Sequence, residues 1–221
     1  MNSYERMMLI LEGKKEEVDR IPCACPCVGT YTLDFMEKYD AHWPEAHKDP
    51  EKMARLGSAA HRECGVESVV IPFDAVVEAE IVGMAPDFRE KQIKKGKLLW
   101  PSVYRQGFRA DGTKIETPDD LIIPDDLANA GRVPVITKAL EILHEEFYGK
   151  VPVVARVIGP TTSLSSYVFD TKEFFSKFYT DLDQIKEIYK PVDKKRVERI
   201  LYTIQKKFTE EDTSQPSPGD I

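Results

Sequence analysis

Residues 68–84, SVVIPFDAVVEAEIVGM, decide the fold that this chain is expected to adopt. Val69–Ile71 are apolar and β-branched with no polar alternation, which is typical of a parallel strand that is covered on both faces. Asp74 follows this run, and a short helix is predicted around residues 75–84. A strand followed by a helix is the repeating unit of a parallel sheet.

Working outward, the same pattern recurs on both sides. RIPCACP at residues 20–26 and VPVVARVIGP at 151–160 are predicted strands, the second one buried. Helices are predicted at 49–64 and 133–147, with a less regular insert over 76–130. This order predicts an α/β fold with parallel strands. Three core strands are too few to close a (β/α)8 barrel, so a partial, TIM-barrel-like arrangement is expected.

The two long helices carry their own start, stop and packing signals. Asp49 can cap the helix at 49–64, Pro50 suits its first turn and Gly65 can end it. A helical period of apolar residues marks one face of the second helix as buried. These residues are Ile136, Ala139, Leu140, Leu143 and Phe147.

The composition excludes several classes of protein. The chain has 221 residues, 42% of them hydrophobic, and a formal net charge of -7, which argues against nucleic-acid binding. No apolar run is long enough to span a membrane, and the N-terminus lacks the features of a signal peptide. The four cysteines do not form a secreted disulfide pattern, so a cytoplasmic location is expected. We expect one domain over 1–208 and a polar disordered tail over 209–221.

Cys23, Cys25 and Cys27 occupy alternate positions of the first predicted strand. Positions two apart on a strand are separated by about 6.6 Å. Thiolates that share one zinc ion must hold their sulfurs within about 4 Å. Two interpretations stay open. The cysteines are small residues that fill the core, or Cys25 and Cys27 converge around Pro26 to bind a metal.

The chain resembles the uroporphyrinogen decarboxylase superfamily and, within it, is most similar to the methylcobamide:coenzyme M methyltransferases. Four segments carry the resemblance, in the family's order and spacing. They are EEVDRIPCACP (16–26), VVIPFDAVVEAEIVGM (69–84), IPDDLANAGRVPVITKALEILHEEFYGKVPVV (123–154) and RVIGPTTSLSSYV (156–168). The resemblance implies the first part of a (β/α)8 barrel, a corrinoid such as methylcobalamin as substrate, and a thiol as methyl acceptor.

The resemblance also implies features that this chain lacks. The methyltransferases bind zinc through a His-x-Cys pair and a later cysteine in the second half of the barrel, and no His-x-Cys pair occurs here. The decarboxylases carry an arginine-rich loop after the first strand, where this chain has CPCVGTYT at residues 25–32. Decarboxylation of a polycarboxylate is therefore not expected.

Asp74 and Tyr167 are candidate catalytic residues, and together with Glu78 they are candidate corrinoid-binding residues. By the resemblance, Asp74 stands where the decarboxylases hold an aspartate over their substrate, and Tyr167 matches a pocket tyrosine. Asp74 is placed where the carboxyl end of a barrel strand builds an active site, although it can also cap the following helix. Glu78, one turn later, either joins Asp74 in binding the corrinoid or belongs to a solvated acidic face. Tyr167 either contacts a ligand or packs, and His42 and His47 around Trp43 are further possible ligands.

Two functions of different classes follow from these observations. The first is an enzyme that transfers a methyl group from a free or protein-bound methylated corrinoid to a thiol such as coenzyme M. The second is a non-catalytic, truncated relative that binds a corrinoid protein or a partner subunit. In both cases the last strand leaves an unpaired edge, which predicts a homo- or hetero-oligomer.

Overall fold

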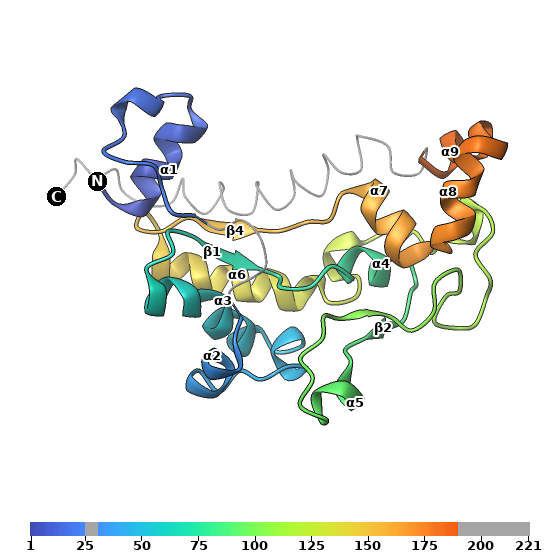
Figure 1. The fold of residues 1–221 in the computed structure, drawn as a ribbon, viewed down its shortest axis with the longest axis horizontal. Helices are drawn as coiled ribbons and strands as arrows, with labels where there is room; N and C mark the ends of the chain where they lie inside the picture. The colour runs from blue at the N-terminus through green and yellow to red at the C-terminus, as the bar shows by residue number, and fades with distance from the viewer. Residues whose placement is uncertain (25–30, 190–221) are drawn as a thin grey trace.

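A computed structural model describes residues 1–24 and 31–189 and confirms the expected α/β class (Figure 1). Strands β1 (Val69–Ile71) and β4 (Val153–Ala155) pair in parallel, with Val69 opposite Val153. Helices α3 (Pro50–Cys64) and α6 (Val133–Phe147) pack against each other and against this pair. Their shared apolar side chains form the first hydrophobic cluster, which includes Leu56, Val69, Ile71 and Leu143.

Helix α3 begins and ends where the sequence predicts. The Asp49 side chain accepts a hydrogen bond from the Lys52 N–H at 2.8 Å, and Gly65 ends the helix in the left-handed conformation at φ 68°. Gly57 lets the helix approach β1 closely, because a Cβ at this position would lie 2.5 Å from Ile71 Cγ2. The helix is thereby seated directly on the strand.

Helix α6 buries the face that its apolar period predicts. All five expected positions lie in the interior, and they are Ile136, Ala139, Leu140, Leu143 and Phe147. The 3.6-residue period alone identifies this face, since one side of the helix must contact the core.

The insert between β1 and α6 forms a second hydrophobic cluster with the C-terminal helices. It contains α4 (Val77–Ile81), α5 (Glu90–Ile93) and the short antiparallel pair β2 (Pro86–Asp87) and β3 (Ser102–Val103). The C-terminal helices are α7 (Pro160–Ser163), a π-helical turn η5 (Leu164–Val168), α8 (Thr171–Thr180) and α9 (Leu182–Tyr189). The cluster includes Val76, Ala79, Met84, Val103, Leu164, Val168 and Phe174.

The N-terminal region differs from the prediction. It contains α1 (Ser3–Leu11), η1 (Lys15–Glu17), α2 (Leu33–Lys38) and η2 (Glu45–His47), and the expected strand at 20–26 is absent over its described part, 20–24. The buried Glu67 engages both backbone groups of Cys23 in this segment, since its own N–H donates to the Cys23 carbonyl at 2.8 Å. Its carboxylate accepts the Cys23 N–H at 2.7 Å and also binds Arg6 and Arg20, so the Cys23 donor is not available to a neighbouring strand.

Strand β4 is less buried than predicted. Val153 and Val154 are half-buried and Ala155 is exposed, whereas all three residues of β1 are buried. Among the described residues, β4 pairs with β1 alone, so its other edge has no neighbouring strand. The end of the predicted domain, residues 190–208, and the predicted tail at 209–221 lie outside the described residues.

No helix in the described part of the chain combines the length and the apolar character that crossing a membrane requires.

Candidate functional site

The carboxylate of Asp74 lies just beyond the carboxyl end of β1 and is almost completely buried, with 2% of its surface exposed. Its Oδ1 accepts hydrogen bonds from the Val76 N–H at 3.1 Å and from Arg132 Nη2 at 3.0 Å. Its Oδ2 accepts from Arg132 Nη1 at 2.9 Å and from His47 Nδ1 at 3.0 Å. Both oxygens are therefore fully engaged inside the protein.

Arg132 supplies the positive charge from the turn that precedes α6. Its two Nη atoms bind Asp74 in the bidentate geometry that suits a guanidinium and a carboxylate. Its Nε donates to Glu80 Oε2 at 2.7 Å, and its Nη1 also donates to the His47 carbonyl at 3.2 Å. We call Asp74, His47, Arg132 and Glu80 the Asp74 network, which links η2, β1, α4 and α6.

His47 is neutral and holds a defined tautomer. Burial lowers its pKa, against the opposing effect of the hydrogen bond to Asp74. Because the Asp74 carboxylate can only accept, the proton lies on His47 Nδ1 and the lone pair on Nε2. That Nε2 atom is buried and has no hydrogen-bond partner among the described residues, and the same is true of Trp43 Nε1.

Aromatic rings enclose the imidazole. The His47 ring centroid lies 4.7 Å from that of Trp43, 4.9 Å from Phe73 and 5.5 Å from Phe88. The Arg132 guanidinium also lies over the Phe88 ring, at 4.8 Å. This apolar surrounding strengthens the charge interactions of the Asp74 network and makes any unpaired charge in it costly.

The charges of the Asp74 network hold one another in place. Burial by itself would raise the pKa of Asp74, but the hydrogen bonds from His47 and Arg132 and the charge of Arg132 outweigh it and lower that pKa. Burial opposes the charge of Arg132 in the same way, yet Asp74 and Glu80 raise its pKa. Both groups are charged at neutral pH.

Asp74 lies beyond the carboxyl end of β1, as expected, but its carboxylate is buried and fully hydrogen-bonded. The alternative use as a helix cap is also modified, because α4 starts at Val77 and Asp74 closes only the turn before it. Sequence reasoning missed Arg132, and it considered His47 only as a loop ligand. The one available signal was an arginine just before a predicted helix and next to Gly131, which does not name its partner.

Glu78 sits in a different environment. It lies on α4, is half-buried, and its Oε1 accepts the Ile158 N–H at 2.8 Å. Burial raises its pKa, and the nearby negative charge of Asp74 adds to this effect. Glu78 thus does not belong to a fully solvated acidic face.

Tyr167 lies on the π-helical turn η5 and is half-buried. Its ring packs against the second hydrophobic cluster, beside Leu164 and Val168. The residue therefore contributes to packing, and its use as a ligand contact remains a prediction.

The cysteines give a partial answer. Cys23 and Cys64 are exposed free thiols, so Cys23 does not fill the core. Cys25 and Cys27 lie outside the described residues. Within 1–24 and 31–189, no group of three His, Cys, Asp or Glu side chains is gathered to hold a metal ion. The described residues therefore do not fit the zinc ion that the resemblance implies.

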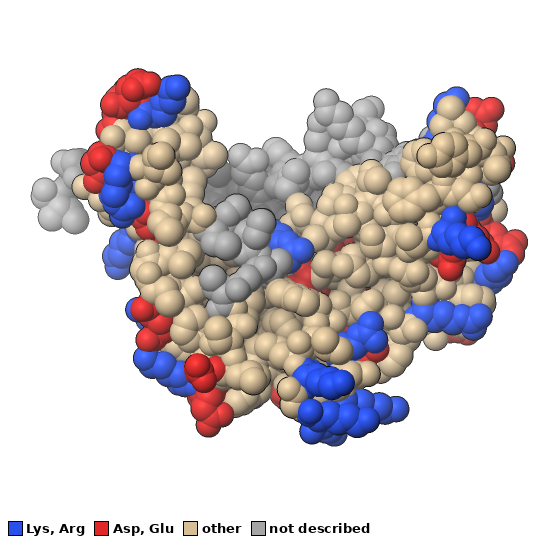
Figure 2. Space-filling view, viewed as in Figure 1, with Lys and Arg blue, Asp and Glu red and all other residues tan. Residues whose placement is uncertain are grey.

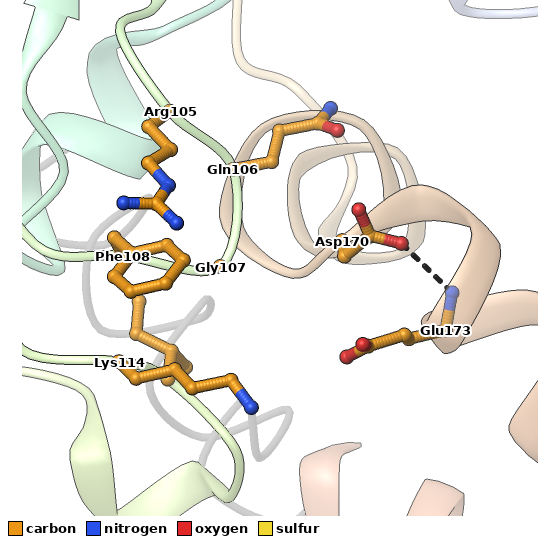
Figure 3. A pocket seen from close by; sticks show the side chains of 8 residues that line it. Arg105, Gln106, Gly107, Phe108, Lys114, Asp170 and Glu173 are labelled. Carbon is orange, nitrogen blue, oxygen red and sulfur yellow. Dashed lines mark hydrogen bonds between the residues drawn. The ribbon is translucent and has the colours of Figure 1, made fainter.

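A separate cavity of about 340 Å³ lies between residues 105–115 and the start of α8 (Figure 3). Its polar groups are largely occupied: Arg105 lies over the Phe108 ring at 3.4 Å, and Asp170 caps α8 by accepting the Glu173 N–H at 3.0 Å. None of its lining residues belongs to the Asp74 network.

Comparison with known proteins assigns the chain to a family. Residues 2–194 match the family described as "Uroporphyrinogen decarboxylase (URO-D)". The chain belongs to this family. It is 36% identical over 171 residues to "Methylcobamide:CoM methyltransferase MtbA" of Methanosarcina mazei, an alignment that covers 77% of this chain and 46% of that protein.

Other URO-D relatives agree. The MtbA protein of Methanosarcina acetivorans is 37% identical over 149 residues, which covers 66% of this chain and 40% of the relative. A solved structure, "methyltransferase from Methanosarcina mazei", superimposes with a TM-score of 0.71 at 29% identity and covers 85% of this chain but 51% of its own. The chain thus spans about half the length of the relatives that it matches.

Proposed function

We propose that this URO-D chain acts in methyl transfer from a methylated corrinoid to a thiol such as coenzyme M. One observation carries the proposal. The MtbA protein of Methanosarcina mazei, named a methylcobamide:CoM methyltransferase, is 36% identical over 77% of this chain. In the proposed step the sulfur of the thiolate attacks the methyl carbon, the cobalt–carbon bond breaks and its electron pair stays on cobalt. The thiol must first lose its proton, because the thiolate is the nucleophile.

Within this proposal the described side chains have distinct roles. Asp74 is a positioning residue, since its carboxylate is saturated by Arg132, His47 and a backbone N–H and acts through the segments that it joins. Glu78 and Tyr167, both half-buried, are proposed to contact the corrinoid or the thiol. A zinc ion would activate a thiol as a Lewis acid. Because the described residues do not fit such an ion, no step is assigned to it.

A second candidate is a non-catalytic module that binds a corrinoid protein or a partner subunit. The edge of β4 favours it, because β4 has no second neighbouring strand among the described residues and an open strand edge invites a further strand. Under either candidate the chain is expected to form a complex, and sedimentation of a monomer at micromolar concentration would contradict this.

A spectroscopic assay separates the two candidates. Purified protein is mixed with methylcobalamin, coenzyme M and zinc, and loss of the methylcobalamin absorbance is followed. Demethylation above the protein-free rate supports the enzyme, and Cys25→Ser combined with Cys27→Ser then tests whether those thiols are needed, with Cys64→Ser as the matched control. Binding of methylcobalamin in equilibrium dialysis without demethylation supports the module. Neither binding nor demethylation would contradict both.

A further inference from the structure

Residues 89–100 form a basic loop in the insert, built on the short helix α5. The helix ends in a closed turn, in which the Gly96 N–H donates to the Ile93 carbonyl at 2.8 Å. The Lys97 N–H donates to the Gln92 carbonyl at 3.0 Å in the same turn. Gly96 adopts the left-handed conformation, φ 73°, that such a turn requires. These bonds hold the backbone of the loop in one shape.

Four lysines project from this turn without a carboxylate to pair with. All four are exposed, and none forms an ion pair among the described residues. We call them the lysine patch: Lys91, Lys94, Lys95 and Lys97. The neighbouring cations, by contrast, are paired, Arg89 with Asp87 at 2.8 Å. Lys48 likewise binds Glu90 at 3.2 Å. Figure 2 shows lysine and arginine side chains gathered in one block where α5 lies in Figure 1, on a chain whose net charge is -7.

An exposed apolar edge borders the lysine patch. Leu99 is 44% exposed and Trp100 is 46% exposed, and they follow the patch directly along the loop. Leu98, just before them, packs against the first hydrophobic cluster and ties the loop to the body of the protein. Large aromatic side chains ringed by polar groups are the usual anchors of protein–protein interfaces. The loop therefore combines free positive charge with an anchor of this kind.

The inner side of Trp100 reaches toward the Asp74 network. Its ring packs edge-on against Trp43, with the ring centroids 5.2 Å apart. Trp43 is buried and lies 4.7 Å from the His47 ring. A molecule that covers Trp100 is therefore separated from the network by one aromatic residue.

The charges around the lysine patch favour an acidic protein as the partner over a nucleic acid or an anionic membrane. A nucleic acid or a membrane presents phosphates over an extended surface, and binding it calls for a broad basic footprint. Here the four lysines are a local exception on an acidic chain, and the carboxylates of Asp87 and Glu90 precede them directly. An acidic patch on a folded protein is small enough to meet the lysines without meeting these carboxylates.

We infer that the lysine patch, with Leu99 and Trp100, is a docking surface for a protein that presents carboxylates around an apolar centre. The lysines attract this partner and select it by charge, and the two apolar side chains lose water in the contact. The inference goes beyond the proposed function and does not rest on it, because none of these residues belongs to the Asp74 network.

Fluorescence anisotropy with two labelled peptides tests the docking surface in the full chain. The first peptide repeats the sequence Glu-Glu-Leu-Leu-Glu-Glu, and the second has serine in place of leucine. At about 20 mM salt both should bind, the leucine peptide more tightly, and at about 0.5 M salt binding of the serine peptide should be lost. The emission of Trp100 should shift to shorter wavelength with the leucine peptide, since the only other tryptophan, Trp43, is already buried.

Two variants separate the charges from the anchor. Glutamine at all four positions of the lysine patch is expected to weaken both peptides roughly tenfold or more. Trp100→Ala is expected to remove the preference for the leucine peptide and to leave the serine peptide unchanged. A matched control replaces four exposed lysines elsewhere, with the same change in net charge, and should bind like the unmodified protein. Its substitutions are Lys15→Gln, Lys138→Gln, Lys150→Gln and Lys172→Gln.

The inference is overturned if neither peptide binds, if the patch variant binds as well as the unmodified protein, or if the control variant loses binding equally. Tighter binding of oligothymidylate, or of vesicles made from equal parts phosphatidylserine and phosphatidylcholine, would assign the surface to another class of partner. A salt-sensitive dimer of the chain alone, lost in the patch variant, would identify a second copy as the partner instead. Urea unfolding confirms that each variant is folded.

The proposed function fails separately from this inference. The assay with free methylcobalamin involves no residue of the docking surface, so absence of demethylation leaves the docking surface standing. Demethylation that is unchanged in the patch variant, together with peptide binding that is also unchanged, contradicts the docking surface alone.

Discussion

Asp74 and Glu78 are carboxylates four positions apart, yet their surroundings drive them in opposite directions. Asp74 accepts four hydrogen bonds, two of them from one guanidinium, and its pKa is lowered despite burial. Glu78 accepts one backbone N–H, and its pKa is raised by burial. The difference shows that burial alone does not set the charge of a carboxyl group; the number of donors that accompany it does. Asp74 is fixed as a buried anion by its donors, whereas Glu78 takes up a proton more readily than an ordinary glutamate.

The largest expected effect comes from breaking the stabilised side of this comparison. Arg132→Met leaves Asp74 and Glu80 without their cation, and Asp74 is then a buried, unpaired charge. We expect a loss of about 3–5 kcal/mol in the free energy of unfolding, measured by urea denaturation at pH 7. Arg105→Met, which removes an arginine that has no carboxylate partner among the described residues, should change stability by within about 0.5 kcal/mol.

A second substitution keeps the first test interpretable. Arg132→Lys retains a positive charge but loses the bidentate geometry, so it should fall between the unmodified protein and Arg132→Met. If both variants unfold at the same urea concentration as the unmodified protein, the Asp74 network does not stabilise the fold.

The sequence predicted the parts of the molecule that depend on local periodicity. The buried face of α6 and the capped start of α3 follow from residues that lie close together along the chain. The strand expected at 20–26 is absent over its described part, 20–24, where Glu67, more than 40 residues later, binds the Cys23 N–H. A local pattern carries no information about such a distant acceptor.

The candidate site was only half predictable for the same reason. Asp74 stood out because it follows an apolar strand, but His47 and Arg132 are 27 and 58 positions away from it. Neither residue stands out in the sequence, and only the fold brings the three side chains together.

A smaller effect should appear in the acid dependence of stability. The pKa of Asp74 is below the ordinary aspartate value of 3.8, so its charge stabilises the folded state above that value and this contribution is lost as the pH falls through the folded-state pKa. Asp74→Asn should therefore flatten the decline of unfolding free energy below about pH 4. Thermal unfolding between pH 2 and pH 7 measures this dependence. At neutral pH the Asp74 charge is expected to contribute on the order of 1–3 kcal/mol to the free energy of unfolding.

Asp111→Asn is the matched control for that experiment. The Arg109 hydrogen bond lowers the pKa of Asp111 to about 2, but this aspartate is exposed and its pair is screened by solvent. In acid, the free energy of unfolding of Asp111→Asn should therefore decline with falling pH much as it does in the unmodified protein. Equal flattening in both variants would mean that burial adds nothing to the Asp74 pair.

The smallest effect, and the one with the opposite sign, belongs to Glu78. A carboxyl whose folded-state pKa is raised contributes stability below its unfolded value of 4.5 and loses it as the pH rises through the folded-state pKa. Glu78→Gln removes this loss, so the variant should be equal to or slightly more stable than the unmodified protein at pH 7, by less than about 1 kcal/mol. It should also lack the decline above pH 4.5 that Glu78 imposes. Destabilisation at pH 7 would show that the Glu78 charge supports the fold, and the contrast with Asp74 would then disappear.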